Sequence, residues 1–462
     1  MIRIGSNRIG RALVKDINVN GIYLGPKLVW GREVELLQMF KASVIADGGI
    51  FDEELFTTEF FRVHQTIRNE AIVLIVCGAY KAGVIYGINC ITGQAVPFTF
   101  GRLGIGTYVD RNGIWRSAGS NLPRIDYEPE TLNLRGYLFE NSGVDLNNYS
   151  TPSSLGQMSS KGGVSIISSL EPDFANEVVF NQPDFPSTTR YWYINNAGAS
   201  MLVGNTYTLT AIIKANFTPV LTALSGSRPD SITVRIGGST VPGQYTYSVK
   251  KLRNNIWIVT ATRTVVGGDN LSFTGILGTI SSTGQVFSVL YAGIEDGAYS
   301  TSLIPTNGSQ GTRAADSLIS QSDLIRDAGS TLYFEGQRKS SGANRLFARS
   351  NNTSGTFAYC TSNNNDWYIY DGVNFRLTSI PNSNDTVSKI AGSFGSNGLT
   401  IVGNGGASAY SPYKGIFSNG VSLFPHRLFG SYASEGKVQN HIRAFAIIHR
   451  ELSQGEQIAL TT

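Results

Sequence analysis

The sequence is poor in charge and in cysteine, and it has no long apolar run. Only 15% of its 462 residues are charged and the formal net charge is +4, so no basic stretch follows a nucleic-acid backbone. Cys77, Cys90 and Cys360 have no CxxC spacing and cannot all pair within one chain. The longest apolar run, Ala71 to Cys77, is far shorter than the roughly 20 residues that cross a bilayer. These absences argue against nucleic-acid binding, a disulfide scaffold and insertion into a membrane.

The N-terminus, Met1 to Arg8, also lacks the apolar stretch of a secretory signal peptide. A chain without a disulfide framework does not need an oxidising compartment in order to fold. We therefore expect a protein that is assembled in a cytoplasm. If it acts outside a cell, we expect that it does not leave by the general secretion route.

Glycine and aromatic side chains, by contrast, are abundant. The chain contains 52 glycines, 21 tyrosines and 23 phenylalanines, and 41% of its residues are hydrophobic. This composition is typical of many short strands joined by tight turns. At about 150 residues per domain, the length predicts about three domains. The composition therefore predicts a mainly β protein with several packed cores.

The first part of the chain is predicted to form an anchor with hairpins and one short helix. Asn20-Gly21 lies between short alternating runs and indicates a β-hairpin in residues 1–33. Three acidic residues, 52–54, precede apolar residues with near-helical spacing, which predicts one short helix between Glu33 and Ala71. We assign 1–33 to an attachment segment and 34–150 to a mixed anchor domain with its connector.

Two sandwich domains are predicted to follow the anchor. Strand runs with the even spacing of a jelly-roll β-sandwich lie between Val164 and Ile304, and further runs lie between Ser330 and His449. Stiff or polar stretches are interpreted as connectors between the units, at 121–129, 151–163 and 305–312. The predicted boundaries are a jelly roll over 151–312 and a second sandwich over 313–462, closed by a short helical turn.

Three stretches, 22–31, 78–127 and 297–316, resemble segments of one known class of proteins: bacteriophage head-fibre, tail-fibre and appendage proteins, especially those of phages that infect Bacteroides-type hosts. The first is the hairpin from Ile22 to Gly31, which is similar to an element near the start of such virion proteins. The second is an ordered set that is similar to a segment of phage fibre proteins: Gly78–Tyr86, Phe98–Arg102, Val109–Ile114 and Asn121–Tyr127.

The third stretch, Gly297–Thr306 with Thr312–Asp316, resembles the junction between a carbohydrate-binding jelly roll and a concanavalin-like lectin domain. The end of the chain, Ile442–Ser453, resembles the last strand of such lectin-like sandwiches. The resemblance implies a fold with a carbohydrate-binding-module-like jelly roll and a concanavalin A/laminin G-like sandwich. It also implies a virion location, exposed on the particle surface after assembly in the host cytoplasm.

The same resemblance implies the partners. These are capsid, tail or baseplate proteins, further copies of the chain in a symmetric oligomer, with a trimer favoured over a dimer, and host cell-surface polysaccharide. Residues of the first hairpin are the implied contacts with the virion: Ile22, Tyr23, Leu24, Val29 and Trp30.

Glycan binding by sandwich proteins depends on aromatic faces that stack on sugar rings, beside polar groups that hydrogen-bond hydroxyls. The candidate residues are Trp192, Tyr193 and Trp257 in the middle domain, and Asn365, Asp366, Trp367 and Tyr370 in the last. Because side chains alternate along a strand, each aromatic is somewhat more often a core residue than a ligand contact. Trp367, beside an Asn-rich loop, is the best single candidate.

Candidate catalytic and metal-binding groups are scarce. Glycan hydrolysis needs two carboxylates roughly 5 to 10 Å apart, and the Glu-x-Asp-x-x-Glu pattern of laminarinase-like lectin folds is absent. The nearest acidic pair, Glu295-Asp296, is interpreted as a turn. The histidines lack metal-ligand spacing: His64, His426, His441 and His449. The sequence predicts no enzyme and no cofactor, and calcium on loop oxygens is the one ion that a lectin-like fold leaves open.

The preferred interpretation is a structural virion component that displays β-sandwich domains for attachment to host-surface glycans. One alternative is a purely structural capsid or tail decoration protein, whose aromatics would be buried or at subunit interfaces. A less favoured alternative is a glycan depolymerase, which would need a cleft with paired carboxylates. The exposure of Trp192, Trp257 and Trp367 distinguishes these alternatives.

Overall fold

The structure is a computed structural model of the chain. It describes residues 23–24, 27–28, 31–152, 164–171, 174–180, 190–193, 201–223, 231–237, 239–253, 255–269, 275–278, 287–320, 324, 329–340, 344–348, 356–361, 366–370, 375–379, 386–395, 398–411, 427–430 and 438–462. In part of these it describes the backbone alone, chiefly in the strands at 23–28, 190–193, 275–278, 338–379 and 427–430.

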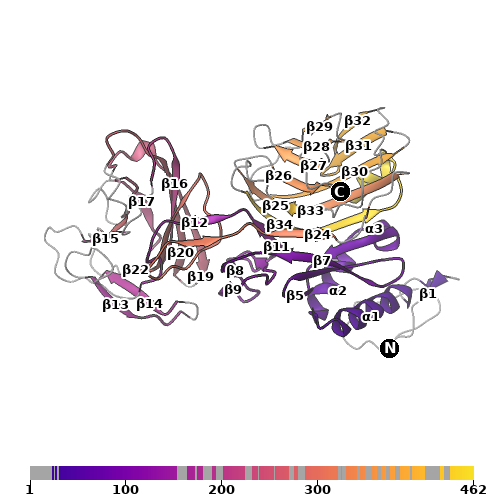
Figure 1. The fold of residues 1–462 in the computed structure, drawn as a ribbon, viewed down its shortest axis with the longest axis horizontal. Helices are drawn as coiled ribbons and strands as arrows, with labels where there is room; N and C mark the ends of the chain where they lie inside the picture. Colours follow the sequence, from indigo (N-terminus) through magenta and orange to yellow (C-terminus); the bar gives the residue numbers. More distant parts are fainter. Residues whose placement is uncertain are drawn as a thin grey trace.

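The chain folds into two units that lie side by side (Figure 1). The smaller unit is a β-sandwich formed mainly by residues 164–296. The larger unit, called here the main body, is formed by residues 31–140 together with residues 317–462. The architecture is dominated by strands in several sheets, so the mainly β class predicted from the composition is confirmed.

Residues 31–70 hold three helices, where the sequence led us to expect one short helix. These are α1 (Gly31–Ala46), α2 (Glu53–Arg62) and α3 (Gln65–Glu70). Side-chain caps set two of the boundaries, because Asp52 accepts a hydrogen bond from the Leu55 amide and His64 accepts one from the Thr66 amide. The acids at 52–54 therefore begin α2, as the pattern predicted, and local capping adds α3 behind it.

The predicted anchor and the predicted last sandwich share one sheet. Strand β4 (Ala71–Val76) pairs with β34 (Val438–Ile448), β34 pairs with β11 (Leu134–Glu140), and β7 (Ala95–Gly101) pairs with β24 (Ser317–Ser320). Segments 34–150 and 313–462 therefore do not fold as separate layers. The physical reason lies in β4, whose sequence AIVLIV is apolar on both faces and requires cover on both.

Each face of the shared sheet packs on its own core. Helices α1 to α3 and the closing helix α5 (Gln454–Thr461) cover one face, with Phe40, Phe56 and Leu460 in contact with alternate residues of β4 and β34. The opposite residues of the same strands pack on strands from both halves of the chain, including Phe98, Phe139 and Phe334. The main body is thus held together by contacts between its N-terminal and C-terminal segments.

The remaining strands of the main body pair antiparallel, as does a separate N-terminal pair. In that pair, β1 (Tyr23–Leu24) and β2 (Lys27–Leu28), Leu24 lies opposite Lys27. The others are β3 (Ile50–Phe51), β5 (Ala79–Lys81), β6 (Val84–Ile88), β8 (Gly106–Val109), β9 (Trp115–Ala118), β10 (Ile125–Tyr127), β25 (Gly329–Ser340), β26 (Asn344–Ala348), β27 (Thr356–Thr361), β28 (Asp366–Tyr370), β29 (Phe375–Ser379), β30 (Val387–Gly395), β31 (Gly398–Gly403), β32 (Ala407–Ser411) and β33 (Arg427–Gly430).

The smaller unit is a two-layered sandwich, as predicted. Its large sheet contains β13 (Val164–Ser168), β14 (Asn176–Phe180), β22 (Phe287–Asp296), β16 (Thr206–Ala215), β20 (Ile256–Thr264) and β19 (Thr246–Arg253) in that order. The second sheet contains β15 (Arg190–Tyr193), β21 (Gly275–Gly278), β18 (Ser231–Arg235) and β17 (Val220–Thr222). Leu209, Ile213 and Val259 of the first sheet share a core with Ile232 and Val234 of the second.

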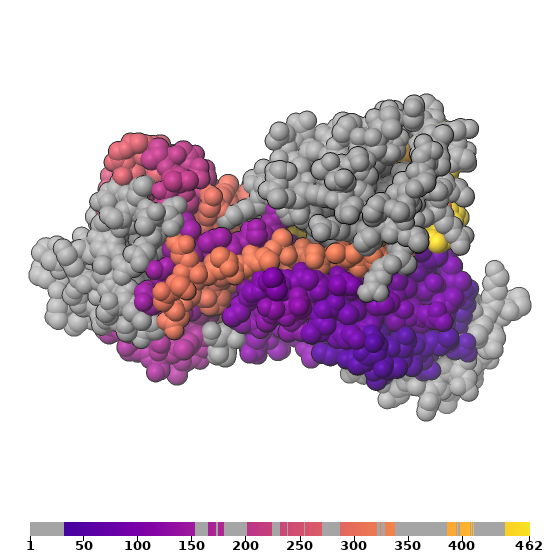
Figure 2. Space-filling model, in the orientation of Figure 1, coloured from indigo at the N-terminus to yellow at the C-terminus, as the bar shows by residue number. Residues whose placement is uncertain are grey.

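The sandwich is inserted into the main body. The chain enters it through β12 (Gly143–Asp145) and leaves it through β23 (Gly311–Arg313), and these two strands pair antiparallel with each other. We call β12 and β23 the stem. Figure 2 shows the segment after the sandwich, in orange, running as a band along the purple surface of the first 150 residues. Among the described residues, no helix has the length and apolar character needed to span a bilayer.

Candidate functional site

Most of the sequence-predicted contact residues lie where their side chains are not described. Trp192 and Tyr193 are in β15, and Asp366, Trp367 and Tyr370 are in β28. Tyr23 and Leu24 are in β1. Asn365, Ile22, Val29 and Trp30 lie outside the described residues, so these predictions stay predictions. Trp257 is the one predicted sugar contact whose side chain the structure describes.

Trp257 is half-buried at one edge of the sandwich. It lies on β20 and packs against the core on the same face as Val259 and Ala261. Its antiparallel neighbour on the edge strand β19 is Lys251, which is exposed. The Lys251 ammonium lies over the indole, 5.8 Å from the ring centroid. This is the geometry of a cation–π contact.

Tyr247 extends this aromatic surface along β19. The register pairs Tyr247 with Ala261, four residues beyond Trp257, so the two aromatics lie about 14 Å apart on one face. Val249 lies between them and is 36% exposed. The Tyr247 ring stacks on Tyr245, with centroids 5.4 Å apart and an interplanar angle of 4°. We call Phe217, Tyr247, Val249, Lys251 and Trp257 the β19–β20 edge.

Local turn geometry brings Phe217 to this edge. A two-residue turn joins β19 to β20, and Asn255 in that turn has a φ of 65°, which asparagine tolerates better than most residues. The Ala215 amide donates to the Asn255 carbonyl at 2.8 Å, so the loop after β16 lies beside the turn. Phe217, in that loop, packs half-buried on the same core as Trp257.

Two polar atoms of the edge are shielded but unpaired. The Tyr247 hydroxyl and the Trp257 indole nitrogen are inaccessible to solvent, and within the described part of the chain neither forms a hydrogen bond. Burial raises the pKa of the Tyr247 phenol, so it is a hydrogen-bond donor at neutral pH. Buried polar groups in folded proteins nearly always have a partner.

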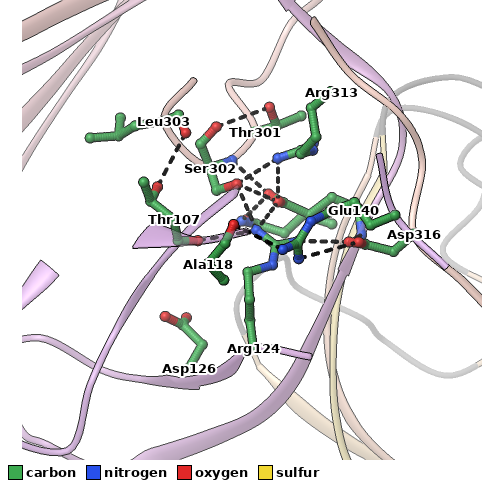
Figure 3. Close-up of polar contacts among 12 residues, drawn as sticks. Thr107, Ala118, Arg124, Asp126, Glu140, Thr301, Ser302, Leu303, Arg313 and Asp316 are labelled. Carbon is green, nitrogen blue, oxygen red and sulfur yellow. Dashed lines mark hydrogen bonds and ion pairs between the residues drawn. The ribbon is translucent and has the colours of Figure 1, made fainter. Parts of the chain in front are cut away.

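A second cluster lies where the stem meets the main body (Figure 3). The guanidinium of Arg124 donates to Glu140 at 2.7 Å and to Asp316 at 2.6 Å. Arg313 donates to the same Glu140 oxygen at 2.6 Å, and Ser302 also donates to Glu140 at 2.6 Å. The four ionic side chains are fully buried. We call this cluster the stem junction.

The charges around the stem junction and the stem shift the pKa values of Glu140 and Asp145 in opposite directions. Burial alone would raise the pKa of Glu140, but the charges of Arg313 and Arg124 outweigh it and lower that pKa to about 2. Among the described residues, Asp145 at the end of the stem has no cationic partner. Burial raises its pKa to about 7, although amide and hydroxyl donors oppose the shift and Glu295 on the facing strand adds to it.

Hydrogen-bond donors surround Asp145 and Glu295, the residue that faces it on β22. Asp145 accepts hydrogen bonds from the amides of Asn147 and Ile294 and from the Tyr291 hydroxyl, each at 3.0 Å. Glu295 accepts from the amide and the hydroxyl of Thr301, each at 2.6 Å. Glu140, Asp145, Glu295 and Asp316 are all 5% exposed or less. Since they are shielded and already bonded, these carboxylates form no open pair that could attack a glycosidic bond.

Two of the stretches interpreted as connectors, 121–129 and 305–312, are parts of this junction, and residues 153–163 of the third lie outside the described residues. Arg124 comes from segment 121–129, while Ser150 and Thr306 bond across the base of the sandwich at 2.7 to 2.9 Å. Polar segments can be buried here because their polar groups form hydrogen bonds with one another. Residues of two of the motifs with the phage-protein resemblance also meet here: Arg102, Arg124, Thr301, Ser302, Arg313 and Asp316 are all buried.

Sequence reasoning missed Tyr247, Lys251 and Phe217. The available signal was the pair Asn254-Asn255 between two strand runs, because a two-residue hairpin turn fixes the register and places Tyr247 on the face of Trp257. His441, which the sequence left isolated, binds Asp126 through Nε2 at 2.8 Å. No group of His, Cys, Asp and Glu side chains in the described residues could hold a metal ion.

Comparisons with known proteins give distant likenesses only. No protein-family model and no curated protein matches the chain. A Ruminococcus gnavus sialidase CBM40, solved with sialyllactose, is 15% identical over 29% of this chain and 82% of its own, with a TM-score of 0.24. The receptor-binding domain of botulinum neurotoxin serotype C/D is 14% identical over 31% of this chain and 38% of its own, with a TM-score of 0.24.

A Trypanosoma rangeli sialidase is 11% identical over 82% of this chain and 68% of its own, again with a TM-score of 0.24. At this level of similarity none of these structures carries an argument about what the chain does. The residues of the β19–β20 edge and of the stem junction are therefore the basis for a function.

Proposed function

We propose that the chain is a non-enzymatic attachment protein of a bacteriophage particle, and that its sandwich binds host-surface glycans at the β19–β20 edge. The observation that carries the proposal is the aromatic face of this edge. Tyr247 and Trp257 line one face of a hairpin, and each has a shielded polar atom without a partner in the described residues. Aromatic faces with nearby donors are the groups that bind sugar rings.

The position of the edge supports this proposal. Asp145 of the stem pairs with Glu295 on β22. Trp257 pairs with Ile213 of β16, and Ile213 pairs in turn with Val289, which is six residues from Glu295 on β22. Six residues of an antiparallel strand span about 20 Å. The Trp257 end of the edge therefore lies away from the point where the chain enters the sandwich, and Lys251 at that end is exposed, so a ligand can reach it.

The stem junction supports a display role. A sandwich attached by two strands and a dry ionic cluster keeps its orientation relative to the main body better than one attached by a flexible linker. Trp115 of the β8–β9 hairpin adds a packing contact on the outer face of the large sheet, beside Leu252 and Ile256. Multivalent attachment, for which a trimer is the form we propose, would benefit from a fixed orientation.

The same junction favours a second candidate function. A decoration protein that binds no glycan would also need rigid units, and the junction is a buried cluster of ion pairs that would supply them. In that case the β19–β20 edge would contact a neighbouring subunit. The two candidates differ in whether a soluble glycan binds to the chain.

The test is binding of the full chain to a panel of capsular and surface polysaccharides, measured by calorimetry. We expect at least one polysaccharide to bind, and Trp257→Ala and Tyr247→Ala to abolish its binding. Tyr410→Ala is the matched control, because Tyr410 is an aromatic side chain on the main body that is 62% exposed. Absence of binding to every polysaccharide would favour the decoration protein. Mass spectrometry of purified phage particles tests the virion location separately.

A further inference from the structure

We infer that the ligand of the β19–β20 edge is an acidic glycan, one with carboxylate-bearing sugars, and that Lys251 selects it. This inference rests on the proposed glycan-binding function and names the substrate class of the same site. The inference depends on which lysine and arginine side chains near the β19–β20 edge have carboxylate partners and which do not.

The neighbouring cations on the other face of the large sheet all have carboxylate partners. Arg253 binds Glu171 at 3.0 Å, and Lys214 lies 3.8 Å from both Glu171 and Glu177. Lys250 binds Glu128 of the main body at 2.6 Å. Each of these positive charges is therefore neutralised locally.

Lys251 differs from its neighbours. It follows Lys250 directly, so its side chain is on the opposite face of β19, the face that carries Val249 and Tyr247. Among the described residues its one interaction is with the Trp257 ring, and it has no carboxylate partner there. The ring contact keeps the ammonium at the rim of the aromatic surface, where a ligand carboxylate can bind it.

The edge has an aromatic ring at each end, with Val249 between them and the Lys251 ammonium at the Trp257 end. A chain of acidic sugars matches this surface in charge and shape, whereas a neutral glycan leaves Lys251 unpaired.

The experiment uses matched ligands that differ in charge alone. Polygalacturonate and polysialic acid, each beside its carboxyl-reduced neutral form, are titrated into the full chain. We expect tighter binding of the acidic forms, weakened when the salt concentration is raised. Lys251→Met should weaken acidic binding about 5-fold, as expected for one exposed charge pair, and should weaken any neutral binding by a smaller factor.

Lys250→Met is the control, because it removes the same charge one residue away on the opposite face. An equal loss of affinity in Lys250→Met and Lys251→Met would overturn the inference, since it would indicate attraction by net charge alone. Equal binding of acidic and neutral forms would also overturn it, while the proposed glycan-binding function would stand. If neither form of either polymer binds, the inference fails, and the wider polysaccharide panel decides the proposed function on its own.

Discussion

Arg124 and Asp316 are 192 residues apart in the sequence and are joined by a hydrogen bond of 2.6 Å, with both side chains fully buried. Arg124 precedes the inserted sandwich and Asp316 follows it. This pair, with Glu140 and Arg313, therefore closes the base of the insertion and connects both segments of the main body to the stem.

Removal of Arg124 should destabilise the protein strongly. Arg124→Met leaves Glu140 and Asp316 buried with less positive charge, and loss of one partner from a buried ion pair costs about 3–5 kcal/mol. We expect a fall of that order in the free energy of unfolding, measured by urea denaturation. The control is Arg111→Met, whose side chain is 61% exposed and 3.6 Å from Asp52, and it should have little effect. Equal effects of both substitutions would contradict the role assigned to Arg124.

Stability should fall in acid because of Glu140. Its pKa is about 2 in the folded protein and near 4.5 when unfolded, so its ionised form stabilises the fold above pH 4.5. This contribution is lost progressively as the pH falls from 4.5 towards 2. Glu140→Gln should be less stable at pH 7 and should lose less stability in acid, as measured by urea midpoints at pH 7, 4 and 3. Parallel pH profiles for the two proteins would rule out this contribution.

Asp145 should act in the opposite direction. Its folded pKa of about 7 lies above the ordinary aspartate value of 3.8, so the folded state binds a proton more tightly than the unfolded state. The resulting stability is fully present below pH 3.8 and is lost as the pH rises through 7. Asp145→Asn keeps an acceptor for the amides of Asn147 and Ile294 without the charge. We expect the variant to gain stability over the natural chain between pH 6 and 8.5; a difference that does not change with pH would count against the proton on Asp145.

Gly293 should not tolerate a side chain. A β-carbon there would lie 2.2 Å from the Tyr291 hydroxyl oxygen and 2.6 Å from an Asp145 oxygen, and both groups are buried and bonded to each other. Gly293→Ala should destabilise the protein by about 1–3 kcal/mol through overpacking. Gly267→Ala is the control, since nothing lies within 4 Å of a β-carbon at that position. Thermal unfolding of both variants checks the difference.

Local patterns in the sequence were sufficient for the fold class and for much of the sandwich. Alternating apolar runs predicted strands at 207–213, 232–236, 245–249, 257–262 and 287–292, and the structure has a strand that contains or overlaps each of these ranges. These features depend on alternation and turn residues within about ten positions, so they can be read locally. The helix start at Asp52 was also local, because a single side-chain cap sets it.

Tertiary structure alone decided which strands pair. Nothing near β4 indicates that it pairs with β34, because an apolar strand fits any sheet interior that covers both its faces, and the partner is more than 300 residues away. Likewise, the burial of Arg124 and Asp316 depends on each supplying the other's missing charge. The sequence by itself determined the strands, turns and aromatic side chains. The shared sheet, the stem junction and the pairing of Lys251 with Trp257 arose from long-range packing and charge complementarity, which act between residues that local patterns do not connect.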